Sequence, residues 1–236
     1  MSRGGLFRLP ISPRSSAIFS WDAASGTPIA RTGQVPSFTR AGDAGAHDSL
    51  GVSFDMAEDQ PRFSVESSAF GLLLAQGEVF YWPMLALPQT LTMYVDWTEL
   101  DMADNTGAVV RLGHDGSGTL ADRAFEIAIT GAASIQGTFK DNVGATFSAS
   151  SAAHPAAGQR CEVRATLVAG GTMTVGVSLN EGTETTGTAS GPSSLPSTWG
   201  AAKLYLGPTA SGRTMLARRL RIFPGTLSMA QCRTRV

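Results

Sequence analysis

Cys161-Glu-Val-Arg-Ala-Thr-Leu-Val168, followed after Ala169-Gly-Gly171 by Met173-Thr-Val-Gly-Val-Ser-Leu-Asn180, is the stretch that decides the fold of this chain. In both runs apolar residues occupy every second position, which is typical of strands with one face in a core and the other in water. The short Ala-Gly-Gly connection suits a tight turn. The stretch therefore predicts two antiparallel strands that pair locally.

The same period of two recurs from Thr90 to Phe223, for example at 91–97 and 125–130. Segments between the runs, such as 104–107 and 140–142, are rich in Gly, Asn and Asp, which tolerate the positive φ angles of turns. No stretch carries an apolar stripe of helical period and useful length. We therefore expect an all-β body of two antiparallel sheets, which at this length is commonly one domain.

Composition narrows the classes of partner. The chain has 236 residues, of which 27 are Gly and 12 are Pro, and it needs neither a disulfide nor a metal to bury a sizeable core. Its net charge of -1 supplies no long-range field to gather nucleic acid or an anionic membrane. No apolar stretch is long enough to span a bilayer. We expect no nucleic-acid partner and no membrane partner.

The first 16 residues mix basic and apolar side chains with Pro10 and Pro13, which favour an extended path. They lack the continuous apolar segment of a secretory signal, so we expect synthesis in the cytoplasm. The segment is either an arm that contacts a neighbouring subunit or a frayed terminus. The candidate assembly contacts on it are Arg3, Phe7, Arg8, Ile11 and Arg14. After this arm we divide the chain into a β segment, 17–88, that packs on or completes the sandwich, and a main β domain, 89–236.

The two cysteines fit no metal-binding spacing, since there is no CxxC motif and the three histidines are scattered. Cys161 falls on the apolar positions of its strand, and Cys232 falls in a short helix. Ser228 with Gln231 three residues later has the spacing of a capping box, which predicts the start of that helix. Two buried free thiols are the expected state, with a disulfide as the open alternative.

Two blocks resemble a known family. Ser37-Phe-Thr-Arg40-Ala, Gln60-Pro-Arg62-Phe63 and Gly71-Leu-Leu-Leu74 are similar to the opening of many tailed-bacteriophage virion proteins of the head-spike, head-fibre or tail-associated type. Val110-Arg-Leu-Gly113 and Leu220-Arg-Ile-Phe-Pro-Gly225 resemble strands of a laminin-G or concanavalin-like jelly roll. The resemblance covers about residues 35–232. The chain departs from the pattern at Ala75-Gln-Gly-Glu78, where the family usually has Glu and later Asn-Leu.

The resemblance implies a two-sheet jelly-roll sandwich in a virion. From it we expect a non-enzymatic structural protein, an accessory or decoration subunit on capsid or tail, whose partners are other virion proteins and its own copies. The alternative is a glycan- or receptor-binding module that contacts the host cell surface. Attachment to head or tail, the symmetry of the oligomer, the glycan and the host stay open.

Carboxylates suggest two further chemistries. Glu99-Leu-Asp101-Met-Ala-Asp104 approaches the ExDxE pattern of concanavalin-type glycoside hydrolases, but Ala103 stands at the third position and 104–107 reads as a turn, so we expect no enzyme. Calcium could bind oxygen ligands at loop ends. The residues considered for it are Asp101, Asp104, Asn105 and Asp115. No recognised ligand spacing occurs, so we expect no cofactor, with calcium as an open alternative.

Two tryptophans and two arginines are the remaining candidates. Trp82 and Trp199 lie beside Pro83 and Gly200, where each ring either stacks on a sugar or plugs the end of the sandwich or a subunit contact. Arg219 and Arg221 share one face of the closing strand. They either form a solvated edge that discourages sheet pairing or bind carboxylates of a partner subunit, and a virion setting favours the partner.

Overall fold

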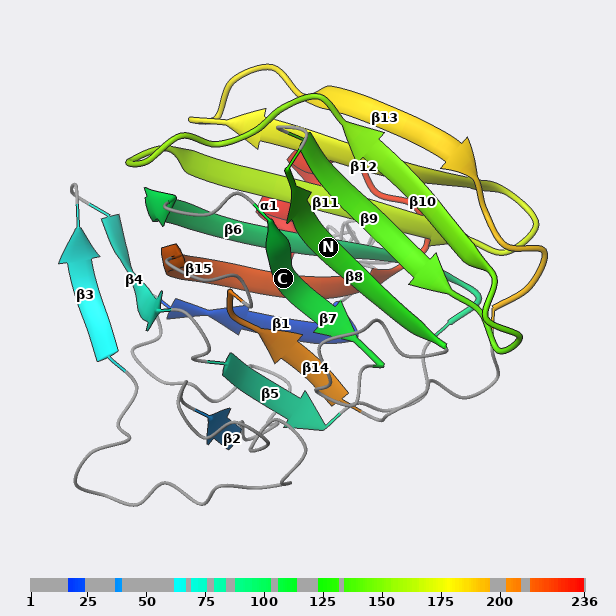
Figure 1. Cartoon of the computed structure of the whole chain (residues 1–236), viewed down its shortest axis with the longest axis horizontal. Helices are drawn as coiled ribbons and strands as arrows, with labels where there is room; N and C mark the ends of the chain where they lie inside the picture. Colours follow the sequence, from blue (N-terminus) through cyan, green and yellow to red (C-terminus); the bar gives the residue numbers. More distant parts are fainter. Residues whose placement is uncertain are drawn as a thin grey trace, which may run out of the picture.

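The described part of the chain folds into two β-sheets packed face to face, with one short helix outside them (Figure 1). This computed structural model describes residues 17–23, 37–39, 62–66, 69–75, 79–83, 88–102, 106–113, 123–131, 134–195, 203–208 and 213–235. Every strand pairing described is antiparallel. The predicted all-β jelly-roll sandwich with a C-terminal helix is confirmed.

The eight-stranded sheet has the order β13-β12-β11-β6-β15-β4-β3, and β1 also pairs with β15. Its strands are β1 (Phe19–Asp22), β3 (Arg62–Glu66), β4 (Ala69–Ala75), β6 (Thr90–Met102), β11 (Arg160–Val168), β12 (Thr172–Leu179), β13 (Thr185–Ser190) and β15 (Arg213–Pro224). The predicted hairpin is confirmed, because Cys161 lies opposite Leu179 and Gly170 takes a φ of 66° in the turn.

The seven-stranded sheet has the order β10-β9-β8-β7-β14-β5-β2. Its strands are β2 (Ser37–Thr39), β5 (Val79–Pro83), β7 (Gly107–Leu112), β8 (Ala124–Thr130), β9 (Ser134–Lys140), β10 (Thr146–Ser151) and β14 (Lys203–Leu206). Strands from the first 88 residues therefore pair within both sheets, with β15 in one and with β14 in the other.

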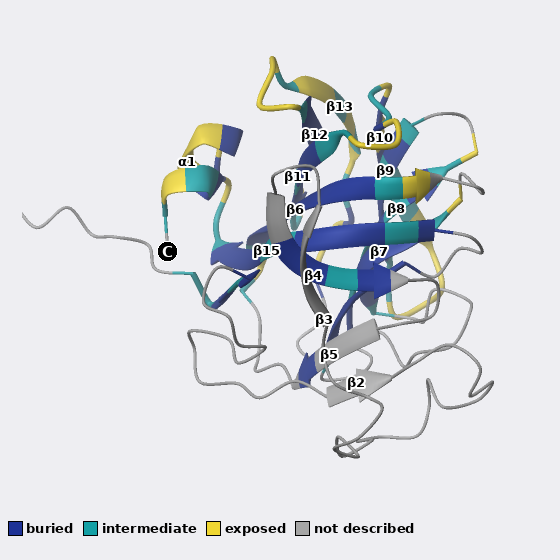
Figure 2. Ribbon diagram, turned by 90° about the vertical axis from the view of Figure 1, so that its left-hand side faces the viewer, coloured by how far each residue is buried: buried dark blue, intermediate teal, exposed yellow. Residues whose placement is uncertain are grey.

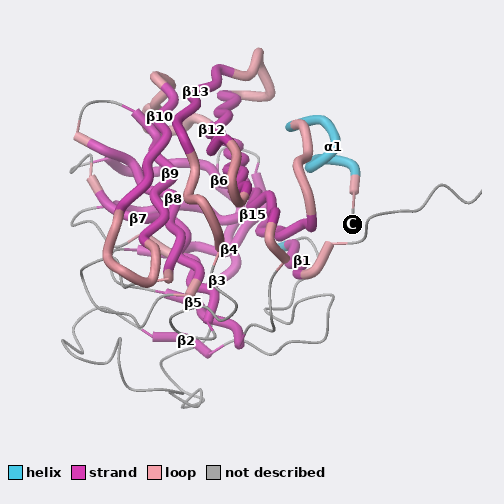
Figure 3. Tube along the Cα trace, turned by 90° about the vertical axis from the view of Figure 1, so that its right-hand side faces the viewer, coloured by secondary structure: helices cyan, strands magenta, loops and turns pink. Residues whose placement is uncertain are grey.

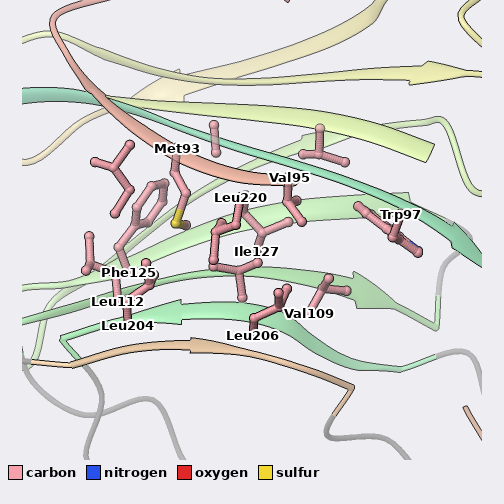
Figure 4. Packing of buried hydrophobic residues seen from close by; sticks show 14 of the residues in the cluster. Met93, Val95, Trp97, Val109, Leu112, Phe125, Ile127, Leu204, Leu206 and Leu220 are labelled. Atoms are coloured by element: carbon pink, nitrogen blue, oxygen red, sulfur yellow. The ribbon is translucent and has the colours of Figure 1, made fainter. Parts of the chain in front are cut away.

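The core lies between the two sheets and consists of the alternate apolar residues that the sequence pattern predicts. Met93, Val95 and Trp97 of β6 face Phe125 and Ile127 of β8 across the interface (Figure 4). All five side chains are buried. Burial of apolar area at about 25 cal/mol per Å² makes this layer the main source of stability.

One long edge of the sandwich is closed by contact between β13 and β10. The Ser151 hydroxyl donates to the Thr185 carbonyl over 2.9 Å. A Cβ atom at Gly187 would lie 1.6 Å from the Ser150 carbonyl oxygen, so only glycine allows the two backbones to approach this closely. Figure 2 shows β13 as largely exposed. The edge of the eight-stranded sheet is thus held against the other sheet.

Helix α1 (Met229–Thr234) lies on the outer side of the eight-stranded sheet, away from β7–β10 (Figure 3). Both hydrogen bonds of the predicted capping box between Ser228 and Gln231 are present. Leu227, Met229 and Cys232 pack on the sheet as a second small apolar cluster. Cys161 and Cys232 are buried free thiols, as predicted, and burial raises the pKa of Cys232 to about 12.

No helix in the described part of the chain is long and apolar enough to cross a membrane.

Gly187→Ala is expected to lower the free energy of unfolding by about 1–3 kcal/mol or more, because the added methyl group would overlap the backbone of β10. Urea unfolding of the purified protein measures the loss. Thr186→Ala, at an exposed neighbouring position of β13, is the control and should change stability by less than about 0.5 kcal/mol. Equal stability of the two variants would contradict the close approach of the strands.

Candidate functional site

The outer face of the eight-stranded sheet carries a network of buried carboxylates and arginines beneath α1. The Glu162 carboxylate accepts hydrogen bonds from the Arg233 Nη2 at 2.6 Å and from the Tyr94 hydroxyl at 2.7 Å. Burial opposes its charge, but these hydrogen bonds and the nearby arginine charges outweigh burial and lower the pKa of Glu162. Glu162 on β11 therefore anchors α1 through Arg233.

A second buried carboxylate, Asp96, organises the arginines beside it. Arg160 donates from Nε and Nη2 to the two oxygens of Asp96, each over 3.0 Å, in the bidentate geometry typical of strong charged pairs. The Nε of Arg219 lies 3.4 Å from the same carboxylate, and its side chain keeps 24% of its surface exposed. Arg219 is thus already paired within the chain, and its role in assembly stays a prediction.

Arg221 does not lie on an exposed edge or at a partner-facing surface, as the sequence predicted, but beneath helix α1. Its side chain is buried, and its Nη1 donates to the carbonyl oxygens of Cys232, Arg233 and Arg235 at the end of α1. Helix ends leave such carbonyls without helical partners, and a cation there is favourable. The prediction that Arg221 contacts a partner subunit is therefore wrong, because the side chain satisfies the helix end of its own chain.

We expect the stability contributed by Glu162 to be lost in acid. Because its pKa in the folded protein lies below the ordinary value of 4.5, the contribution is fully present above that value and disappears as the pH falls through the folded pKa. Unfolding followed against pH should show Glu162→Gln less stable than the wild type near neutrality, with the difference shrinking in acid. A difference that stays constant over that range would contradict the assignment.

A fully buried ion pair stands at one end of the core. Arg213 donates from Nε to Oε1 of Glu99 at 3.1 Å and from Nη2 to Oε2 at 2.5 Å, and the Trp97 indole also donates to Oε2 at 3.0 Å. Both side chains are completely buried, whereas Asp101 is exposed. Glu99 is thus held by an arginine inside the core, which is unlike a carboxylate that lines a groove beside a second carboxylate.

Arg213→Met is expected to lower the free energy of unfolding by about 3–5 kcal/mol, because it leaves the Glu99 charge buried without its partner. Adding Glu99→Gln, which keeps an acceptor for Trp97, should recover part of that loss. Urea unfolding of the two single variants and the double variant measures the coupling. Additive losses would contradict a direct buried pair.

Trp82 is buried with 0% of its surface exposed, so the prediction of a sugar-stacking ring is wrong for this residue. Its ring packs edge-on against Phe19, with centroids 5.2 Å apart, and tilted against Trp21 at 6.0 Å. The ring is therefore part of the hydrophobic core. Trp199 and the predicted arm contacts Arg3, Phe7, Arg8, Ile11 and Arg14 lie outside the described residues.

The residues that the structure describes contain no group of three or more His, Cys, Asp or Glu side chains that could hold a metal ion. Of the oxygen ligands considered for calcium, Asp101 is exposed at the end of β6. Asp104, Asn105 and Asp115 fall outside the described part of the chain.

The outer face of the seven-stranded sheet has a different character. In Figure 1 its strands β7–β10 lie in front of the eight-stranded sheet, and α1 lies behind. Strand register brings one residue from each of five adjacent strands into a line, from β14 through β7, β8 and β9 to β10. These residues, which we call the cross-strand row, are Tyr205, Arg111, Glu126, Thr138 and Ser148. Their sequence neighbours point into the core, so the row lies on the outer face of the sheet. Two of its members, Tyr205 and Thr138, are buried there, and the other three are partly exposed.

Hydrogen bonds connect the members of the row. Arg111 donates from Nε to Oε2 of Glu126 over 3.2 Å, and the two side chains keep 11% and 16% of their surface exposed. Burial raises the pKa of Glu126, while the charge of Arg111 acts in the opposite direction. The Ser148 hydroxyl donates to Oγ1 of Thr138 at 3.3 Å.

A second line of polar groups runs beside the row. The Thr138 hydroxyl donates to Oε1 of Gln136 at 3.1 Å, and the Gln136 amide donates to Ser150 at 3.1 Å. At the turn between β8 and β9, the hydroxyl groups of Thr130 and Ser134 are hydrogen-bonded to each other over 2.7 Å. The face thus combines the ion pair of Arg111 and Glu126 with several hydroxyl and amide groups. Such groups can form hydrogen bonds with a ligand that carries many hydroxyls.

Sequence reasoning missed this face entirely. The alternation marked Glu126 and Thr130 as the outward positions of their strand, but it did not tell which strands are neighbours. Only one feature of the sequence pointed to this face. Short polar residues occupy many of the outward positions of 134–150.

No protein-family model matches this chain, and no curated protein sequence matches it. Solved structures do share its fold. One is domain 4 of AbnA, a GH43 extracellular arabinanase from Geobacillus stearothermophilus, in complex with arabinotriose, with a TM-score of 0.60 at 13% identity; the match covers 92% of this chain and 97% of that chain.

Botulinum neurotoxin structures match over part of their length. The binding domain of type DC in complex with SialylT has a TM-score of 0.62 at 10% identity, covering 94% of this chain and 51% of that chain. A type C structure, from a study of cell entry that depends on two ganglioside molecules, has a TM-score of 0.59 at 11% identity, covering 91% and 49%. The chain spans about half the length of these neurotoxin domains. At these identities the likeness shows a shared β-sandwich fold.

Proposed function

We propose that this chain is a non-enzymatic carbohydrate-binding module whose ligand contacts the outer face of the seven-stranded sheet. The partly exposed members of the cross-strand row, Arg111, Glu126 and Ser148, carry the proposal, because they set an ion pair and a hydroxyl group on the outer face of regular strands. Sugar hydroxyls both donate and accept hydrogen bonds, so they suit a surface that offers both kinds of group.

The similar structures support this proposal over an assembly role. Arabinotriose is bound to the arabinanase domain, which this chain matches over nearly its whole length, and the type C neurotoxin interacts with gangliosides. A fold by itself does not fix a function, so the polar row has to carry the chemistry. In the other face of the sandwich the carboxylates are paired internally and partly covered by α1, which leaves them less able to bind a ligand.

We also propose that the chain is part of a virion. This more specific proposal rests on the sequence resemblance of residues 35–232 to tailed-phage proteins. None of the solved structures named above is a phage protein. On a capsid or tail, many copies of one weak sugar site would give high avidity. In that setting a decoration role and contact with the host surface are compatible, and the chain acts by binding without turnover.

Binding to a glycan array, followed by calorimetry with the glycans that are retained, tests the proposed function. We expect weak single-site binding that Glu126→Gln reduces about tenfold, because the variant loses the charged partner of Arg111 and the charged acceptor for sugar hydroxyls. Thr186→Ala, on the exposed side of β13, is the control and should bind as the wild type does. Absence of any retained glycan, or full binding by Glu126→Gln, would contradict the proposal.

A further inference from the structure

We infer that residues 152–159, the connection between β10 and β11, form a pH-sensitive switch that is closed while His154 is neutral and opens when this ring takes up a proton. The connection lies beside the end of β6. There the Gly158 amide donates to the Glu99 carbonyl over 2.7 Å, and the Glu99 amide donates to the Gln159 carbonyl over 3.0 Å. These two backbone hydrogen bonds hold the connection in its closed position.

The connection buries little of its own surface. Ala156, Ala157 and Gly158 are exposed, and Pro155 is the one residue of 152–159 that is buried. Segments with few buried apolar contacts open locally at a small cost in free energy. A change of charge within this connection can therefore open it while the sandwich stays folded.

The Nε2 atom of His154 is the atom that takes up the proton. The ring is hydrogen-bonded to the backbone of Pro155, which has a carbonyl oxygen but no N–H, so the ring is the donor. Nε2 is buried and has no hydrogen-bond partner, so the donor is Nδ1. The neutral ring therefore has its lone pair at Nε2, and a proton added there would be buried without an acceptor.

The charged groups beside His154 are Glu99 of β6 and Arg213 of β15. Both carboxylate oxygens of Glu99 already accept hydrogen bonds, from Arg213 and from Trp97. The Nη1 atom of Arg213 is itself buried without a hydrogen-bond partner. On β11, Cys161 lies near the same pair and stays a neutral thiol, because burial raises its pKa. A protonated ring would thus add a second cation beside an arginine that already lacks one acceptor.

The direction of the pH response follows from these surroundings. Burial lowers the pKa of His154 below its ordinary value of 6.5, and Arg213 acts in the same direction, whereas Glu99 and the bond to Pro155 act against it. The closed form therefore binds the proton less readily than the open form does. Its stability is fully present above pH 6.5 and is lost as the pH falls through the lower pKa of the closed form.

Hydrogen exchange of single amides, followed by NMR from about pH 8 to about pH 5.5 and corrected for the intrinsic rate at each pH, tests the switch. We expect the protection of the Gly158 and Glu99 amides to fall about two- to tenfold at the acid end. The Gly225 amide, which donates to the Thr90 carbonyl over 2.9 Å at the other end of β6, is the internal control. Its protection should stay constant.

Two variants assign the response to one ring. His154→Asn keeps a polar side chain that does not titrate, and it should abolish the acid loss of protection at Gly158. The double variant His47→Asn/His114→Asn removes the other two histidines of the chain and should retain that loss. The unfolding midpoint of each variant near neutral pH shows that it is folded.

Three outcomes would overturn the inference. The wild type could keep full protection at Gly158 in acid, or His154→Asn could lose as much protection as the wild type. An equal loss at Gly158 and Gly225 would show acid unfolding of the whole sandwich instead of local opening. None of these outcomes bears on sugar binding, so the proposed function is tested separately.

Discussion

The pairing of β15 with its neighbours is the constraint on which the rest of the structure depends. Over Arg213–Pro224 this strand bonds to β6 on one side and to β4 and β1 on the other. It therefore joins strands from the first 88 residues to strands that come later in the chain. The register shift between Ala217 and Arg219 keeps Ala217 and Leu220 in the core on its two sides and turns Arg219 toward Asp96. Without this pairing the first strands and α1 would have no common support.

The polar side chains on the two outer faces of the sandwich differ in their burial and in their partners. On the eight-stranded sheet, Asp96 and Glu162 are buried and their charges are met by Arg160 and Arg233 of the same chain. Such a face is committed to stability and to holding α1. On the seven-stranded sheet, the ion pair of Arg111 and Glu126 lies beside strands that carry hydroxyl and amide groups, of which Gln136 and Ser148 are partly exposed. This difference, more than the shared fold, makes the second face the candidate for ligand binding.

Predictions from the local sequence pattern were accurate for features that depend on a few consecutive residues. The period of two correctly placed the strands and the buried side of Cys161, and the spacing of Ser228 and Gln231 correctly began the helix. Predictions for single surface residues were less accurate. Trp82 beside a proline looked like a loop residue but lies in β5 with its ring against Phe19, and Arg221 looked like a surface cation but closes the end of α1.

The sequence by itself determined the class of fold, the location of most strands and the inward side of each, because alternation is a property of a few consecutive residues. Only the tertiary structure decided which strands are neighbours and in what register. Glu126 lies opposite Arg111 on one neighbouring strand and opposite Thr138 on the other. Tyr205 lies opposite Arg111 on its other side, although the two residues are 94 positions apart in the sequence (205 less 111). Contacts of this kind depend on long-range pairing that no local pattern encodes, so the candidate site emerged only when the sheet was assembled.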